Sequence, residues 1–259
     1  MFFSKAFSLF VLVPFISASL ALERRQVDVD LTTHCGQWDS VAAAPYRLHV
    51  NQWGKNATSE GQSCGQVTSL NQNTIAWNNS WSWLGTPDDR IKSYTSVVLQ
   101  GINKQLSAIE SIPVDWQWFN QFSEMQVSNV ALTISTTRAP GKPNANKIMI
   151  WLANYNAKPL SHNRDDAGNA VPVATNVTLA EQNWNLYIGT NGATTVYSFL
   201  PSATSSELKS FQADANDFVK YLDNQGLDQT QYLTVVQAGV EATYGSAVFS
   251  TTSYSAVVN

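Results

Sequence analysis

Two short segments of the chain place a single charged side chain inside a run that is otherwise uncharged. Residues 146–152 read NKIMIWL, and residues 237–246 read QAGVEATYGS. Side chains alternate along an extended strand, so Lys147, Met149 and Trp151 share one face while the aliphatic side chains between them share the other. The aliphatic face belongs in a core, where an unpaired lysine is very rarely found. We therefore expect Lys147 to point into a surface cleft.

Both segments resemble the active-site strands of glycoside hydrolase family 12, the secreted endo-glucanases and xyloglucanases. That family places one Glu directly before an Ile-Met-Ile-Trp-type run and a second Glu in a Gly-Thr-Glu-Pro-Phe pattern. Here Glu241 stands at the second position, within Gly-Val-Glu-Ala-Thr, and Lys147 stands at the first. The resemblance implies that Glu241 is the acid/base residue and that Lys147 replaces the nucleophilic Glu. The alternatives are an exposed strand-end charge at Lys147 and an ordinary loop carboxylate at Glu241.

A second departure from the family lies on the strand that precedes Lys147. The family carries a Val-Ala-Tyr-Asp-type run there, and its Asp hydrogen-bonds the nucleophile region. This chain reads VALT at 130–133, so Thr133 stands where that Asp would be. The resemblance implies a site that is no longer constrained for glycosyl transfer, although Thr133 is equally interpreted as an ordinary strand residue.

The lysine bears directly on whether the protein can hydrolyse a glycosidic bond. Retaining glycosidases divide this reaction between two carboxylates about 5–5.5 Å apart. An ammonium beside the oxocarbenium-like centre repels it by about 3 kcal/mol at ~5 Å and an effective dielectric of ~20. The lysine also removes the attraction that a carboxylate would exert on this centre. Together the two changes raise the activation free energy by roughly 6 kcal/mol, which lowers the rate by about four to five powers of ten. A lysine opposite Glu241 also favours an ion pair that keeps Glu241 ionised and unable to donate a proton.

We therefore expect a protein that binds β-1,4-glucan or xyloglucan in an open cleft with little or no hydrolysis. The alternative is an active retaining endo-β-1,4-glucanase in which Glu241 is the acid/base residue and a displaced carboxylate, Glu124 or Asp115, is the nucleophile. A third interpretation is a structural or signalling protein that has also lost its ligand. Competition for a protein partner that recognises active relatives is one use of such an inactive protein.

Flat aromatic side chains decide whether sugar still binds, because pyranose rings stack their C–H faces on them. The run NQWG at 51–54 matches the family's Asn-Asn-Leu-Trp-Gly element, so Asn51 and Trp53 are expected substrate-binding residues. Met149 and Trp151 follow, since they share the face of Lys147. Five further tryptophans are as readily core residues as ligand platforms: Trp81, Trp83, Trp116, Trp118 and Trp184.

The overall pattern is that of an all-β protein. Short segments rich in Val, Ile, Thr, Tyr and Trp alternate with Asn, Gly, Ser and Pro, which predicts an antiparallel sandwich. Asn191-Gly192 between the segments 184–188 and 194–199 predicts a type I′ hairpin. An apolar stripe over 205–225, ended by Gly226, predicts one long helix. The resemblance implies a jelly roll of two curved antiparallel sheets with that helix packed on the outside.

The start of the chain predicts export. Residues 1–22 read as a secretory signal, with a short apolar run and small residues near its end. A dibasic processing site at 23–25 would leave Gln26 as the mature start; a solvated charge pair is the alternative. No other stretch is apolar enough to span a membrane. We expect residues 26–259 to form a single secreted, extracellular domain that is monomeric.

The composition of the chain limits the classes of ligand that it can be expected to bind. Only 13% of the residues are charged, the net charge is −4, and the chain holds nine Trp and nine Tyr. This balance disfavours nucleic acid as a partner and favours neutral, hydroxyl-rich ligands. The three histidines lack metal-ligand spacing and no phosphate-binding loop appears, so we expect no metal and no other cofactor.

Secretion also bears on the cysteines and on three sequons. In an oxidising compartment Cys35 and Cys64 pair by default, which stabilises by roughly 3–4 kcal/mol on the chain-entropy estimate. The resemblance implies the same bridge. Asn-X-Ser/Thr triplets begin at Asn56, Asn78 and Asn176 and predict exposed glycosylation sites if the host glycosylates.

Overall fold

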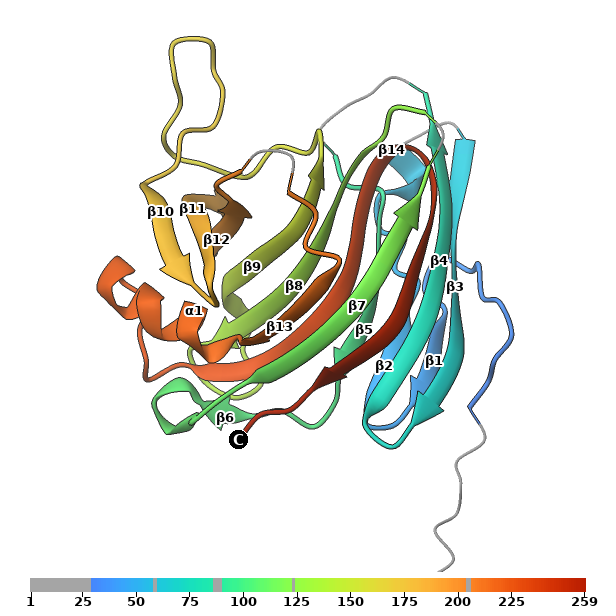
Figure 1. Ribbon diagram of the computed structural model, residues 1–259, viewed down its shortest axis with the longest axis horizontal. Coiled ribbons are helices and arrows are strands. Elements are labelled where there is room, and N and C mark those ends of the chain that lie inside the picture. The colour runs from blue at the N-terminus through green and yellow to red at the C-terminus, as the bar shows by residue number, and fades with distance from the viewer. Residues whose placement is uncertain (1–28, 58–59, 86–89, 123, 204–205) are drawn as a thin grey trace, which may run out of the picture.

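The computed structural model describes residues 29–57, 60–85, 90–122, 124–203 and 206–259. The expected secretory signal, the dibasic site and Gln26 lie outside these residues. In the described part, two curved β-sheets face each other and enclose the core (Figure 1). No helix in the described part is long and apolar enough to cross a membrane.

The first sheet, called the inner sheet, carries the cleft described below on its free face. Its strands run in the order β1-β2-β5-β14-β8-β9-β12-β11-β10, and β6 pairs with the start of β14. Every pair is antiparallel except β9 with β12, which is parallel. The bounds are β1 (Ser40–Ala43), β2 (Tyr46–His49), β5 (Ser93–Leu99), β6 (Lys104–Gln105), β8 (Val127–Thr137), β9 (Asn144–Tyr155), β10 (Ala174–Leu179), β11 (Gln182–Asn191) and β12 (Thr194–Pro201).

The second sheet, called the outer sheet, has the order β3-β4-β14-β7-β13. Its strands are β3 (Glu60–Asn71), β4 (Thr74–Leu84), β7 (Pro113–Gln121) and β13 (Ser210–Asp214), together with the second half of β14 (Tyr232–Ala256). The helical elements are short and comprise α1 (Asn216–Tyr221) and the 3₁₀ turns η1 (Lys55–Ala57), η2 (Leu106–Ala108) and η3 (Leu222–Gln225). The predicted jelly-roll class is confirmed.

Strand β14 is the structural link between the two sheets. Its residues 232–244 pair with β5 and β8 in the inner sheet, and its residues 245–256 pair with β4 and β7 in the outer sheet. The change occurs at Gly245, whose φ of +95° suits glycine. A Cβ there would lie 2.6 Å from the carbonyl oxygen of Met125. Gly245 therefore sets the path of the strand that carries Glu241.

Aromatic side chains fill the space between the sheets. Trp77, Trp83, Trp116 and Trp184 are fully buried, and the rings of Trp77 and Trp116 stack with their centroids 6.1 Å apart. The sequence left five tryptophans as either core residues or ligand platforms. Three of these are among the fully buried residues just named, and the other two, Trp81 and Trp118, are only 3% exposed. All five are therefore core residues. Such aromatic pairs stabilise a core beyond the area that they bury.

The predicted long helix over 205–225 is wrong in extent; of its residues, Ser205 also lies outside the described part. The segment 210–214 is strand β13, which pairs with β7 and places Phe211 opposite Trp116. Phe211 is buried in a strand as it would be in a helix, so the stripe alone does not decide between the two periods. The segment forms a strand because the free edge of β7 supplies hydrogen-bond partners for its backbone.

The remaining helix α1 packs on the core side of the inner sheet. Phe218 lies edge-on to Trp184 of β11 and to Phe199 of β12, with ring centroids 5.2 and 5.1 Å apart. The chain then passes through η3 to Gly226, which ends the helical segment in the left-handed conformation, as predicted. The helix thus covers the end of the inner sheet that the outer sheet leaves open.

The hairpin of β11 and β12 is confirmed, but its turn lies one residue later than predicted. Asn191 pairs with Thr194, so the central positions are Gly192 and Ala193. Of these two, only Gly192 has a positive φ, +59°. A positive φ at the first central position alone is the requirement of a type II′ turn, not of type I′.

Cys35 and Cys64 form the disulfide that joins the N-terminal segment to β3. The bridge closes a loop with a sequence separation of 29 residues. It lies beside the antiparallel bridge between His34 and Gly65. The N-terminal segment is thereby fixed next to the residues that lead to Trp53.

We expect Gly245→Ala to destabilise the protein more than Gly141→Ala. Both glycines have a positive φ, +95° and +74°, but an added Cβ at Gly141 meets no atom within 4 Å. Gly141→Ala should cost about 1–3 kcal/mol of unfolding free energy for backbone strain alone. Gly245→Ala should cost roughly a further 1–3 kcal/mol for the clash with Met125. Urea unfolding followed by tryptophan fluorescence measures both, and equal losses would contradict the role given to Gly245.

Candidate functional site

An open cleft of about 500 Å³ lies on the free face of the inner sheet. Strand β9 supplies Lys147, Met149 and Trp151 to its lining, and β14 supplies Glu241. Met149 and Trp151 are each 3% exposed and form its floor, whereas Trp53 is 41% exposed and stands at its rim. Alternation along β9 places the aliphatic neighbours in the core between the sheets, as the sequence predicts.

An ion pair occupies the centre of the cleft. The ammonium nitrogen of Lys147 lies 2.7 Å from Oε1 of Glu241. The Glu241 side chain is 3% exposed and that of Lys147 is 25% exposed. A contact this short and this poorly solvated is a charge-assisted hydrogen bond. The positive amine therefore faces the cleft and is held against the buried carboxylate.

Asn129 on β8 hydrogen-bonds to the second oxygen of this carboxylate. Its side-chain amide donates to Oε2 of Glu241 at 3.0 Å, so each carboxylate oxygen accepts one hydrogen bond. Sequence reasoning missed Asn129. The available signal was strand parity, since Asn129 lies on the same face of β8 as Ala131 and Thr133.

Tyr94 on β5 forms the platform beneath the lysine. The Lys147 nitrogen lies 5.4 Å from the centroid of the Tyr94 ring, within the range of a cation–π contact. Burial, reinforced by the charge of Glu241, raises the pKa of Tyr94 far above its ordinary value. The phenol therefore stays neutral, and it acts as a hydrogen-bonding group. The sequence motifs give Tyr94 no role, so only the structure identifies it.

Thr133 contacts this phenol and not the ion pair. Its hydroxyl lies 2.9 Å from the Tyr94 hydroxyl, and the same tyrosine donates to the carbonyl oxygen of Ala131 at 3.3 Å. Thr133 is fully buried. The position at which the family resemblance implies an Asp therefore holds a neutral group that is bonded to a neutral phenol.

Trp53 and Asn51 differ in what they present to the cleft. The Trp53 ring lies edge-on to Tyr94, with centroids 6.4 Å apart, and exposes part of its surface. Asn51 is not among the lining residues. Its carbonyl oxygen accepts the Tyr94 backbone N–H at 3.0 Å, and its φ is +51°. In the structure Asn51 thus shapes the turn that presents Trp53, and its binding role stays a prediction.

The two displaced carboxylates of the alternative interpretation lie elsewhere. Asp115 is on β7 of the outer sheet, opposite Gln212 and Ser255. Glu124 is an exposed residue that does not line the cleft. Within the described ranges, Glu241 is the one carboxylate that lines the cleft. Neither candidate nucleophile is therefore placed to attack a sugar bound there.

The free face of the inner sheet thus carries an open cleft whose lining combines aromatic, amide and carboxylate groups, and such a lining suits a polar ligand. The family description Glycosyl hydrolase family 12 matches residues 44–259. The chain belongs to this family.

Curated relatives cover nearly the whole chain. It is 40% identical to xyloglucan-specific endo-beta-1,4-glucanase A of Emericella nidulans, with 93% of this chain and 95% of that protein covered. It is 38% identical to the protein of the same name from Aspergillus niger, with 89% and 92% covered.

Solved structures agree on the fold. The catalytic domain of Humicola grisea Cel12A, in complex with a soaked thio cellotetraose, has a TM-score of 0.80 and 31% identity, covering 89% of this chain and all of that chain. Endoglucanase 3 of Trichoderma harzianum has a TM-score of 0.78 and 29% identity, covering 90% and 99%.

We expect a double-mutant cycle to reveal strong coupling between Lys147 and Glu241. Lys147→Met leaves a buried carboxylate without its cation and should lower the free energy of unfolding by about 1–3 kcal/mol. This loss is smaller than that expected for a fully buried ion pair, because Lys147 is partly exposed. The double variant Lys147→Met with Glu241→Gln should lose less than the sum of the single variants.

The exposed pair of Lys209 and Glu207 provides the control for this cycle. Its charged atoms are 2.6 Å apart, but the side chains are 52% and 32% exposed. Lys209→Met should therefore change the free energy of unfolding by about 1 kcal/mol or less. Chemical denaturation compares the variants, and additive losses at Lys147 and Glu241 would show that the two do not interact.

Proposed function

We propose that the protein binds β-1,4-linked glucan or xyloglucan in the cleft and hydrolyses it little or not at all. The ion pair between Lys147 and Glu241 is the observation that carries this proposal. It supports the absence of hydrolysis, because it fixes a positive charge in the cleft and occupies the carboxylate at the acid/base position. The binding part of the proposal is argued from other groups in the same cleft.

The argument against hydrolysis is chemical. A general acid must give a proton to the leaving oxygen, yet Glu241 accepts hydrogen bonds on both oxygens from an ammonium and an amide. A retaining mechanism also needs a second carboxylate that attacks the anomeric carbon. Protonated Lys147 has no lone pair for this attack, and its charge opposes the positive charge that develops on the sugar. An active glucanase with a displaced nucleophile is therefore not favoured.

The argument for binding rests on groups that still suit a sugar. Trp53 offers an exposed ring for stacking. Three buried polar atoms in the cleft lining have no hydrogen-bond partner among the described residues: Oδ1 of Asn129, Nε1 of Trp151 and Oγ of Ser198. Buried polar groups are normally satisfied, so a small rotation of these side chains toward the cleft would let the hydroxyls of a bound glucan supply the missing partners. These unpaired atoms also argue against complete loss of the ligand.

The same proposal includes an extracellular location. The apolar start of the chain, the disulfide between Cys35 and Cys64 and the uncharged polar surface all suit export into an oxidising medium. The fungal relatives described above are xyloglucan-specific endo-beta-1,4-glucanases according to their names. A partner protein that recognises active relatives and the monomeric state stay predictions.

We expect Trp53→Ala to weaken binding of xyloglucan oligosaccharides. Loss of one stacking platform should raise the dissociation constant roughly 2- to 12-fold, equivalent to about 0.5–1.5 kcal/mol. Isothermal titration calorimetry measures this change. Trp38→Ala is the matched control, because Trp38 is 65% exposed and lies outside the cleft lining. If both variants bind like the wild type, the cleft is not the glucan site.

We expect the wild-type protein to release no detectable reducing ends from xyloglucan or barley glucan. Lys147→Glu combined with Thr133→Asp should restore measurable turnover, with an upper limit of about four to five powers of ten over the wild type. Lys147→Gln is the control, because it removes the positive charge without adding an attacking group, and it should stay inactive. Robust wild-type hydrolysis that Glu241→Gln abolishes would refute the proposal.

A further inference from the structure

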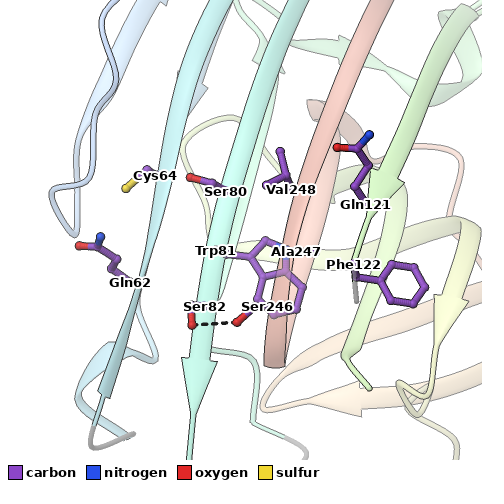
Figure 2. A pocket seen from close by; sticks show the side chains of 10 residues that line it. All are labelled: Gln62, Cys64, Ser80, Trp81, Ser82, Gln121, Phe122, Ser246, Ala247 and Val248. Carbon is purple, nitrogen blue, oxygen red and sulfur yellow. Dashed lines mark hydrogen bonds between the residues drawn. The ribbon is translucent and has the colours of Figure 1, made fainter. Parts of the chain in front are cut away.

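The face of the outer sheet that points to solvent holds a shallow groove of about 520 Å³. Figure 2 shows its lining side chains, which come from β3, β4, β14 and the end of β7. Figure 1 shows the two sheets facing each other. The groove is on the other side of the sandwich from the glucan cleft, because that cleft lies on the free face of the inner sheet. The groove is therefore a site separate from the one that binds glucan.

The strand register orders the groove into rows. The first row crosses the sheet through Cys64, Ser80, Val248 and Gln121. The second row contains Gln62, Ser82 and Ser246, and the hydroxyls of its two serines are 2.9 Å apart. None of these side chains is charged. Val248 and the nearby Phe122 leave 44% and 46% of their surface exposed. Hydroxyls and amides beside exposed apolar groups suit a carbohydrate.

Asn78 lies in the row next to this groove. Its row contains Gln66, Asn78, Ser250 and Phe119, and Phe119 is 38% exposed. Asn78 begins the sequon Asn78-Asn79-Ser80, whose last residue is itself a groove residue. Asn79 is fully buried, so alternation turns Asn78 and Ser80 to solvent. The Asn78 side chain is half-buried and makes no hydrogen bond with the described residues.

We propose that Asn78 carries an N-linked oligosaccharide and that the first sugars of this oligosaccharide lie in the groove. In the transfer, the Asn78 amide nitrogen forms a bond to C1 of the first sugar of a lipid-pyrophosphate-linked oligosaccharide. The bond from C1 to the pyrophosphate breaks, the lipid pyrophosphate leaves, and the amide gives up one proton. The proposal rests on export through the secretory pathway and not on glucan binding.

Geometry places the sugars over the groove. Two residues along a strand span about 7 Å, so the row of Ser80 and Val248 lies one such step from Asn78. Neighbouring strands are about 4.8 Å apart, which puts Phe119 roughly 10 Å from Asn78 across β14. A short oligosaccharide attached at Asn78 reaches both. Its C–H faces would cover Val248 and Phe119, and its hydroxyls would meet the serine and glutamine side chains.

The covalent sugar is favoured over a free glucan chain because the sequon and the groove share Ser80. A glycan attached one row away is present at a very high effective concentration, whereas a free chain must compete with it. No described residue of the other two sequons lines this groove or the cleft. Asn56 lies in η1 near Trp53, and Asn176 lies on the edge strand β10, both exposed.

The test uses full-length protein secreted by a glycosylating fungal host, with Ser80→Ala and Ser82→Ala as matched variants. Ser80→Ala destroys the sequon while keeping Asn78, and Ser82→Ala changes a groove hydroxyl outside the sequon. Peptide mass mapping should find the glycan on Asn78 in the wild type and in Ser82→Ala, and none in Ser80→Ala. Circular dichroism checks that all three proteins are folded.

Hydroxyl-radical footprinting locates the sugars. Oxidation of Phe119 and Phe122 should rise about twofold or more in Ser80→Ala relative to the wild type, with Trp38 as an unchanged reference. A secreted wild type with unmodified Asn78 overturns the proposal, and so does a modified Asn78 whose loss leaves the footprint unchanged. Protection of the two phenylalanines in Ser80→Ala by added xyloglucan oligosaccharide would assign the groove to an external chain instead.

Discussion

The ion pair between Lys147 and Glu241 is the interaction on which the properties of the cleft depend. A carboxylate that is almost wholly removed from water needs a compensating partner, and the lysine ammonium supplies it at 2.7 Å. Asn129 satisfies the other oxygen, so the acid is surrounded by donors. The cation and the anion attract each other, and the carboxylate is held as a hydrogen-bond acceptor on both oxygens. The proposal that the cleft binds glucan without hydrolysing it depends on this pair.

The surrounding fold holds this pair in place. Strand β14 carries Glu241 between β5 and β8 and then crosses to the outer sheet at Gly245. Tyr94 reaches from β5 to the backbone of β8 and lies under the lysine. A buried network of Thr136, Asn146 and Gln231 joins β8 and β9 to the residue that precedes β14, and its Asn146 comes directly before Lys147. The site is therefore built on rigid strands, with neutral hydrogen-bonding groups in the positions that support it.

Uncharged polar chemistry recurs on both free faces of the sandwich. In the cleft it appears as buried polar atoms without a hydrogen-bond partner among the described residues, beside an exposed tryptophan. On the outer sheet it appears as rows of serine, glutamine and asparagine beside exposed phenylalanine and valine. The groove of the outer sheet offers hydrogen bonds without charge, whereas the cleft combines such groups with the ion pair of Lys147 and Glu241. The low content of charged residues agrees with these two faces.

The sequence by itself determined the all-β class, the face of β9 that bears Lys147, the hairpin of β11 and β12, and the pairing of the two cysteines, because alternation and turn residues are local properties. It did not determine the extent of the helix, since Phe211 is buried under either period and only pairing with β7 selects a strand. Nor did it reveal Tyr94 or Asn129. By register, Glu241 faces Asn129 and Lys147 faces Ser135, six positions away along β8 (129 to 135), or about 20 Å on a flat strand. The curvature of the inner sheet, a collective result of packing, and the length of the two side chains together bring the charges into contact.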